Sequence, residues 1–287
     1  MESSRIELGD KRTGTYDAAT VSWQSRLVIY SNYVYVPIAI LVIWEFSARA
    51  GLINRHIIPS PSMIAIAWYD WAFGTLDMLG RYSGTWSMHL TSSARRVLIG
   101  FTIDLAVAIP LGVAVGSSRT LERIIDPTLQ VIRPIPITSW LPLSMAFFGI
   151  KDSSAIFLIF LGGFFAIFLN TVAGVKLVDK TLIQAGQMLG CGPADLFVNV
   201  VLRAALPSVF TGMRISLGMA WMAVIVSEMV AVKSGIGYVL WDAYYYMRMD
   251  LLVATMLTVG ALGFLSDRVL VLIADRTLRW AKGGGMG

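Results

Sequence analysis

Between two long apolar stretches the chain carries Gln184-Ala185-Gly186-Gln187-Met188-Leu189-Gly190, followed by Val200-Val201-Leu202-Arg203-Ala204-Ala205-Leu206-Pro207. This segment is too polar to lie in lipid, and its pattern predicts a short helix, a turn at the glycines, and a second short helix. Its apolar side chains could fit a groove on another protein. These are Leu182, Leu189, Leu196, Phe197 and Val200. The segment therefore predicts a docking surface on one side of a membrane.

Most of the remaining chain is apolar. Hydrophobic residues make up 56% of the 287 residues and charged residues only 14%, whereas soluble domains carry about 25% charged residues. The mean hydropathy is +0.69, and several apolar runs reach the roughly 20 residues that a helix needs to cross the hydrocarbon layer. We therefore predict an all-α membrane protein. The net charge of +5 is typical of basic cytoplasmic loops and does not indicate nucleic-acid binding.

Six transmembrane helices are predicted, at about residues 30–50, 96–116, 127–150, 154–175, 207–232 and 251–273. Residues 1–29 are expected to form a cytoplasmic tail, and residues 281–287 a C-terminal tail. The Trp-rich residues 51–95 predict an amphipathic segment on the outer face, with a helix that begins near Pro61. Six spans place both termini on the same side, and basic residues are modestly more numerous on the side that we take as cytoplasmic.

The third apolar segment is interrupted by Pro134, Pro136 and Pro142. Proline lacks the backbone N–H, and backbone groups left free in a membrane need partners from protein or water. This segment should therefore be buried in protein or line a cavity. The hydrophilic stretch Ser117–Asp126 before it and the residues around Tyr244–Tyr246 are expected to be loops.

Charged residues inside spans are expensive in lipid, so each one is a candidate for function. Arg214 and Asp267 lie at similar distances from the cytoplasmic ends of their spans, so they share a depth and can pair. We favour this structural pair over a substrate contact for Arg214. Glu228 lies about 21 Å farther along the same helix, near the outer mouth, either as a gate or docking contact or as an interfacial acid. Asp104 faces the bundle or a partner helix.

The polar segment resembles the cytoplasmic coupling loop of binding-protein-dependent ABC importer permeases. The family pattern is Glu-Ala-Ala, three residues, Gly, nine residues, and Ile-x-Leu-Pro. Here Gln184-Ala185-Gly186 occupies the triplet, Gly190 the glycine and Val200-x-Leu202 the end, with Gln184 in place of the acid and Arg203 in place of the proline. Four further segments resemble the taurine, sulfonate and nitrate branch of these permeases. They are Arg133–Leu143, Ala220–Ala223, Ser227–Met229 and Ser234–Tyr238.

This resemblance implies a type I importer permease in which residues 96–280 form the permease core and residues 176–206 a cytoplasmic coupling helix-turn-helix. The residues expected to contact an ATPase are Gln184, Ala185, Gly186, Leu189, Gly190, Phe197, Val200 and Leu202. The residues expected along the translocation pathway are Pro136, Trp140, Pro142, Arg214, Trp221 and Glu228. The solute implied is a small oxyanion or organic anion, namely a sulfonate, taurine, nitrate, bicarbonate or an aromatic acid.

The partners implied are ABC ATPase subunits that bind ATP and Mg, a periplasmic or lipid-anchored solute-binding protein, a second copy of this chain, and the lipid of a bacterial cytoplasmic (inner) membrane. The sequence holds no Gly-x-x-x-x-Gly-Lys-Ser/Thr motif, so we expect no nucleotide, cofactor or metal site and no enzymatic reaction in this chain. The alternative is an ion-coupled secondary transporter of a small anion. Such proteins commonly show inverted repeats and midplane carboxylates, and the sequence shows neither pattern.

Overall fold

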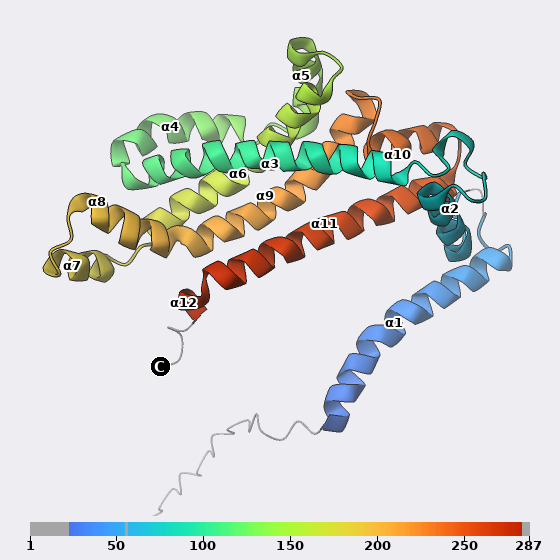
Figure 1. Cartoon of the computed structure of the whole chain (residues 1–287), viewed down its shortest axis with the longest axis horizontal. Coiled ribbons are helices and arrows are strands. Elements are labelled where there is room, and N and C mark those ends of the chain that lie inside the picture. The colour runs from blue at the N-terminus through green and yellow to red at the C-terminus, as the bar shows by residue number, and fades with distance from the viewer. Residues whose placement is uncertain (1–22, 55–56, 283–287) are drawn as a thin grey trace, which may run out of the picture. The chain divides into compact units, whose positions relative to one another are not determined.

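The computed structural model describes residues 23–54 and 57–282, and these residues form helices and turns without a strand. The predicted all-α fold is confirmed (Figure 1). The chain divides into two units after Ile53, of which the first holds helix α1 (Trp23–Arg49). This helix begins before the expected start of the first span at Tyr30. Of the predicted tails, residues 1–22 and 283–287 lie outside the described residues.

The second unit contains all the other described helices. In chain order they are α2 (Pro61–Phe73), η1 (Gly80–Tyr82), α3 (Trp86–Ser117), α4 (Arg119–Ile132), η2 (Ile137–Trp140), α5 (Leu141–Phe148), α6 (Asp152–Lys176), α7 (Lys180–Met188), α8 (Pro193–Asp195), the π-helical η3 (Leu196–Leu202), α9 (Arg203–Val230), α10 (Ile236–Tyr245), α11 (Met249–Thr277) and α12 (Arg279–Lys282). Helix α2 starts as predicted, with Pro61 in its first turn and the Ser60 side chain accepting from the Met63 N–H.

Four of the described helices are long and apolar enough to cross a membrane: α3, α6, α11, and the continuous helix from α8 through η3 to α9. Helix α4 and the segment Ile137–Phe148, which comprises η2 and α5, are bent by 89° relative to each other. They make a fifth span if they are counted as one broken helix. The prolines of the third apolar segment therefore break it as predicted. The first predicted span, at about residues 30–50 within α1, stays a prediction, because α1 is not among these helices.

Three of the expected boundaries are wrong, and in each case a helix carries polar residues that resemble a loop in sequence. Helix α3 starts at Trp86 and adds a polar first part to the predicted second span. Most of Ser117–Asp126, expected to be a loop, belongs to α4, which Ser118 caps through its hydroxyl. The residues up to Tyr245 form α10. Helices can expose one polar face, so low hydropathy alone does not exclude them.

Helices α3, α6 and α9 lie side by side and form the centre of the second unit (Figure 1). Glycines let them approach closely. A Cβ on Gly112 of α3 would lie 2.8 Å from the Cβ of Thr171 on α6, and a Cβ on Gly212 of α9 would lie 2.8 Å from the Cβ of Asn170. Small residues at helix contacts favour such packing in lipid, where the hydrophobic effect does not drive helices together.

The two ends of this bundle differ. Helices α7 and α8 lie at one end, which we call the α7 end, and α2 and α10 lie at the opposite end, which we call the α10 end (Figure 1). At the α10 end the buried Asp70 accepts hydrogen bonds from the N–H groups of Leu76, Met78 and Leu79. Desolvation raises the pKa of Asp70, but the hydrogen bonds to its charged form outweigh this and hold the pKa below its usual value.

Candidate functional site: a tip hairpin, a cavity and a buried ion cluster

At the α7 end, α7, α8 and η3 form a helical hairpin (Lys180–Leu202), here called the tip hairpin. Its turn is a Schellman motif, in which the Cys191 N–H donates to Gly186 O at 3.1 Å and the Gly190 N–H donates to Gln187 O at 3.0 Å. Gly190 has φ of +80°, which confirms the predicted glycine turn. Helix α7 begins at Asp179, whose carboxylate accepts from the Thr181 N–H at 2.8 Å, and this bond lowers the pKa of Asp179.

The apolar residues of the tip hairpin divide into two groups. Leu182, Met188 and Leu189 are 51%, 89% and 83% exposed, so they are available for a partner. Leu196 is buried instead, because it packs into the notch at Gly186, where a Cβ would lie 2.5 Å from its Cδ2. Leu196 therefore packs α7 against η3 and is not exposed for contact with a partner.

The other residues predicted to contact an ATPase lie on both helices of the tip hairpin. Gln184 and Ala185 are exposed, whereas Phe197, Val200 and Leu202 are partly buried. The expectation of a separate second short helix is wrong. From Pro193 the chain continues without a break into α9, and Pro207 lies inside that helix. A single proline removes only one helical hydrogen bond, and a long helix packed by its neighbours tolerates this.

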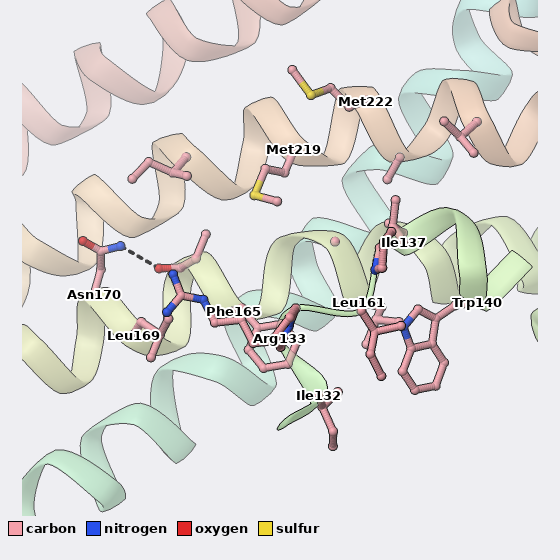
Figure 2. Close-up of a pocket in the computed structure, with 18 residues that line it drawn as sticks. Ile132, Arg133, Ile137, Trp140, Leu161, Phe165, Leu169, Asn170, Met219 and Met222 are labelled. Carbon is pink, nitrogen blue, oxygen red and sulfur yellow. Dashed lines mark hydrogen bonds between the residues drawn. The ribbon is translucent and has the colours of Figure 1, made fainter. Parts of the chain in front are cut away.

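A cavity of about 560 Å³ lies at the proline break between α4 and α5, with α6 and α9 as its other walls (Figure 2). Of the predicted pathway residues, Pro136 and Trp140 line it. The remaining lining is mostly aliphatic, aromatic or methionine. Its polar side chains are those of Arg133, Trp140 and Asn170. The Asn170 amide nitrogen donates to Ala166 O at 2.8 Å.

The four other predicted pathway residues do not line this cavity. Pro142 is exposed on α5. Trp221 is 6% exposed and donates from its indole nitrogen to Ser266 Oγ at 2.9 Å, so it joins α9 to α11. Periodicity alone does not show which face of a helix meets its neighbours and which faces a cavity.

The predicted pairing of Arg214 with Asp267 is confirmed. Two hydrogen bonds of 2.8 and 3.0 Å join the guanidinium to both carboxylate oxygens. The side chains are 49% and 33% exposed, so the pair lies on the flank of the second unit and not in its interior. This geometry satisfies Arg214 within the chain and leaves it unavailable as the basic contact for a solute.

Glu228 is fully buried at the α10 end, in a cluster that we call the Arg96 cluster (Ser93, Arg96, Asp152, Glu228 and Ser234). The Arg96 guanidinium contacts Glu228 Oε1 at 2.6 Å, Asp152 Oδ1 at 2.7 Å and Ser234 Oγ at 2.7 Å. Ser93 Oγ donates to Glu228 at 2.8 Å. The Glu228 carboxylate has no exposed surface, so the alternative of an interfacial acid is wrong. The expected role as a gate or docking contact stays a prediction.

The Arg96 cluster also fixes the connection between α9 and α10. The Gly237 N–H donates to Glu228 Oε2 at 2.9 Å, the Ile236 N–H donates to Ser93 Oγ at 2.9 Å, and the Gly235 N–H donates to His89 Nδ1 at 3.1 Å. Three consecutive backbone donors at the start of α10 thus find partners on α3 and α9. This is how a helix start can be satisfied without a capping side chain of its own.

Asp104 faces the interior of the bundle, which resolves the alternatives left open by the sequence. It has no exposed surface, its Oδ2 accepts from Ser216 Oγ at 3.4 Å, and its Oδ1 has no hydrogen-bond partner among the described residues. A buried carboxyl with so few partners is costly. Asp104 projects from α3 toward Gly163 of α6 and Ser216 of α9, and it is not among the residues that line the cavity.

Sequence reasoning missed Arg96, Arg133 and Asn170 as site residues. Arg96 stands at the expected start of the second span, where a basic residue is common and carries no specific signal. Arg133 begins the proline-rich segment used for the resemblance, so the signal for it was present in the sequence. Asn170 is a lone amide in a long apolar helix, and such a residue is itself a sign of a polar contact.

Comparison with known proteins agrees with this geometry. Residues 108–279 match the family described as "Binding-protein-dependent transport system inner membrane component". The chain belongs to this family and is a multi-pass membrane permease of the ABC transporter class.

Individual relatives extend the match over most of the chain. It is 38% identical to an ABC transporter permease protein of Methanocaldococcus jannaschii, with 87% of this chain and 91% of the relative covered. It is 35% identical to a protein of Escherichia coli named as the aliphatic sulfonates transport permease protein SsuC, with coverage of 86% and 90%. It is 31% identical to the nitrate import permease protein NrtB of a Synechocystis species, with coverage of 85% and 90%.

A solved structure confirms the fold class. An inward-facing form of the MetNI methionine ABC transporter matches with a TM-score of 0.54 at 19% identity, over 65% of this chain and 95% of that chain. At this identity the likeness concerns the fold alone. The predicted type I importer permease fold is therefore confirmed.

Proposed function

We propose that this chain is the translocation subunit of an ATP-driven importer for a small oxyanion or organic anion. The observation that carries the proposal is the cavity at the proline break, which lies among apolar spans and holds an arginine and two neutral polar side chains but no acidic one. Such a lining favours an anion over a cation. The names of two relatives, one for aliphatic sulfonates transport and one for nitrate import, support the same class of solute.

The tip hairpin would transmit the energy. Its exposed Leu182, Met188 and Leu189 would enter a groove on an ABC ATPase subunit that binds ATP and Mg. Closure of the ATPases would then move the hairpin as a rigid element and switch the bundle between two states of access. Because Leu196 packs against Gly186, movement of α7 would pass directly to the helix that continues into α9.

The assembly would contain two copies of this chain, related by a two-fold axis along the pathway. The α7 end and both termini would face the cytoplasm of a bacterial cell. A periplasmic or lipid-anchored solute-binding protein would dock at the α10 end, which lies opposite the tip hairpin (Figure 1).

Transport measurements on purified protein test this proposal. The chain is reconstituted in vesicles alone with a proton or sodium gradient, and separately with its ATPase subunits and ATP, and uptake of labelled taurine, an alkane sulfonate and nitrate is followed. We expect uptake only with ATPase and ATP. Robust gradient-driven uptake by the chain alone would instead support the ion-coupled secondary transporter.

A further inference from the structure

We propose that Arg133, together with Asn170, forms a contact site for the anionic head group of the solute inside the cavity that Trp140 also lines. The proposal deepens the proposed function and rests on it, because it assigns to the permease itself a part of the selectivity for anions. It starts from the position of Arg133 directly after α4, at the point where the chain turns into Pro134 and Pro136.

The prolines hold Arg133 in place. Each of them restricts its own φ, and Arg133, directly before Pro134, keeps helical backbone angles (φ −53°, ψ −42°). The Arg133 N–H donates to Leu129 O at 2.9 Å, so its backbone still belongs to the last turn of α4. The side chain therefore starts from a rigid corner. Figure 2 shows its guanidinium in the cavity on the same side as the carboxamide of Asn170, which α6 contributes.

The charge that lines the cavity is positive, without a negative charge beside it. Arg133 is the charged residue among those that line it, and no acidic side chain joins it there. The indole N–H of Trp140 makes no hydrogen bond within the described part of the chain, and Asn170 uses only one of its two amide hydrogens, on Ala166 O. Arg133 and Asn170 thus offer unused N–H donors on one side of the cavity (Figure 2), and an anion can accept from both of them.

Arg133 has no acidic partner within the described residues, whereas two other arginines of the spans do. Arg96 is satisfied by Glu228 and Asp152, and Arg214 by both oxygens of Asp267. Arg133 forms no ion pair and no side-chain hydrogen bond with any residue that the structure describes. The cavity residues of α6 lie between Leu161 and Asn170, in the middle of that helix. The side chain of Arg133 is exposed, so an anion that enters the cavity can reach it.

The shape of the cavity fits an anion larger than a bare ion. Its volume of about 560 Å³ lies in the range of roughly 300–1,000 Å³ that is typical of sites for organic ligands. Phe165 of α6 and Met219 and Met222 of α9 provide apolar walls (Figure 2). We infer that an anionic head group, such as a sulfonate or carboxylate, contacts Arg133 while a short apolar tail lies against these walls.

The first test measures the electrostatic potential in the cavity and needs no ATPase. A Met219→Cys variant in a Cys191→Ser background is labelled with sulfonatoethyl methanethiosulfonate, which is anionic, and with its trimethylammonium analogue, which is cationic. We expect Arg133→Gln to lower the ratio of anionic to cationic labelling rates by about tenfold, because a unit charge acts strongly at low dielectric. Arg123→Gln, an exposed arginine of α4 outside this cavity, should leave the ratio unchanged.

The second test separates the charge from the guanidinium. Propane sulfonate should slow labelling of the Met219→Cys thiol, whereas the uncharged dimethyl sulfone should not. Arg133→Lys should retain the ratio of the two reagents but weaken the protection, because an ammonium cannot form the two parallel bonds of a guanidinium. If the Arg133→Gln variant does not insert into the membrane, the Met219→Cys protein that retains Arg133 still tests the proposal. Propane sulfonate must then slow labelling of its thiol. Absence of protection, or an unchanged reagent ratio, would overturn the proposal.

Uptake by the full complex distinguishes this inference from the proposed function. We expect Arg133→Gln to reduce ATP-driven sulfonate uptake about tenfold or more, since charge-assisted hydrogen bonds are about twice as strong as neutral ones, while Arg123→Gln retains it. If the Arg133→Gln complex takes up sulfonate as fast as the unmodified complex, the inference about Arg133 is wrong, but the proposed importer function is still supported. Absence of ATP-driven uptake by the unmodified complex would contradict the proposed function, whatever the labelling shows.

Discussion

The two ends of the helix bundle are held together by different interactions. At the α10 end, buried charges join helices that are far apart in sequence, as Arg96 of α3 does with Asp152 of α6 and Glu228 of α9. At the α7 end, the tip hairpin is held by a local backbone turn and by Leu196 in the notch at Gly186. The comparison shows that one end is held by long-range ion pairs and the other by short-range contacts with exposed apolar side chains beside them. Damage at the α10 end should destabilise the whole bundle, whereas damage at the tip should remain local.

The largest effect is expected from Arg96→Met. The change leaves Glu228 buried and without its counter-charge, and breaking a buried pair in this way costs about 3–5 kcal/mol. Thermal unfolding in detergent measures the loss. The matched control is Arg95→Met, whose side chain is 65% exposed and also pairs with Asp152, and which should cost under about 1 kcal/mol. Equal losses for Arg95→Met and Arg96→Met would contradict the view of the Arg96 cluster as the fixed part of the bundle.

Gly235→Ala should produce the next largest effect. Gly235 has φ of +114°, and an added Cβ would overlap with the carboxylate of Glu228. The positive φ and the crowding together should cost about 2–4 kcal/mol. Gly149→Ala provides the control, because Gly149 has φ of +73° but no atom within 4 Å of the added Cβ. If both variants unfold at the same temperature, contact with Glu228 adds nothing and the connection before α10 is less rigid than proposed.

The pair of Arg214 and Asp267 should have a smaller effect. It is bidentate but partly exposed, so a coupling energy of about 1 kcal/mol is expected, above that of many surface pairs and below that of the Arg96 cluster. A double-mutant cycle with Arg214→Met and Asp267→Leu, read by thermal unfolding in detergent, measures it. Strictly additive effects would show that the pair contributes no coupling. A coupling as large as that between Arg96 and Glu228 would show that this flank is covered in the assembly.

Gly190→Val should have the smallest effect on unfolding of the bundle and a large one on transport. A β-branched residue tolerates a φ of +80° badly, so the turn of the tip hairpin should distort while the helices below it remain folded. We expect a change in bundle stability within about 0.5 kcal/mol, together with a clear loss of ATP-driven uptake. Gly192→Ala, at an ordinary φ of −69°, should retain uptake. Normal transport by Gly190→Val would contradict the role of the tip hairpin in coupling.

The parts of the fold that could be predicted are those that depend on neighbours in the chain. The break at Pro134 and Pro136, the start of α2 at Pro61 and the turn at Gly190 each follow from the backbone preferences of the residues concerned. The start of α3 could not be predicted in this way, because its first turns are polar, no side chain caps them, and they become helical through packing at the α10 end. The same holds for α10, whose first N–H groups bond to Ser93, His89 and Glu228.

The sequence by itself determined that this chain is a helical membrane protein with a proline break and a polar hairpin, because hydropathy and backbone preference are properties of short segments. Only the tertiary structure decided which arginine is free. Arg96, Arg133 and Arg214 each stand in or beside an apolar run, yet Arg96 finds Glu228 at a separation of 132 residues and Arg214 finds Asp267 at 53. Charge pairing is decided by proximity in space, and proximity at such separations exists only once the helices have packed.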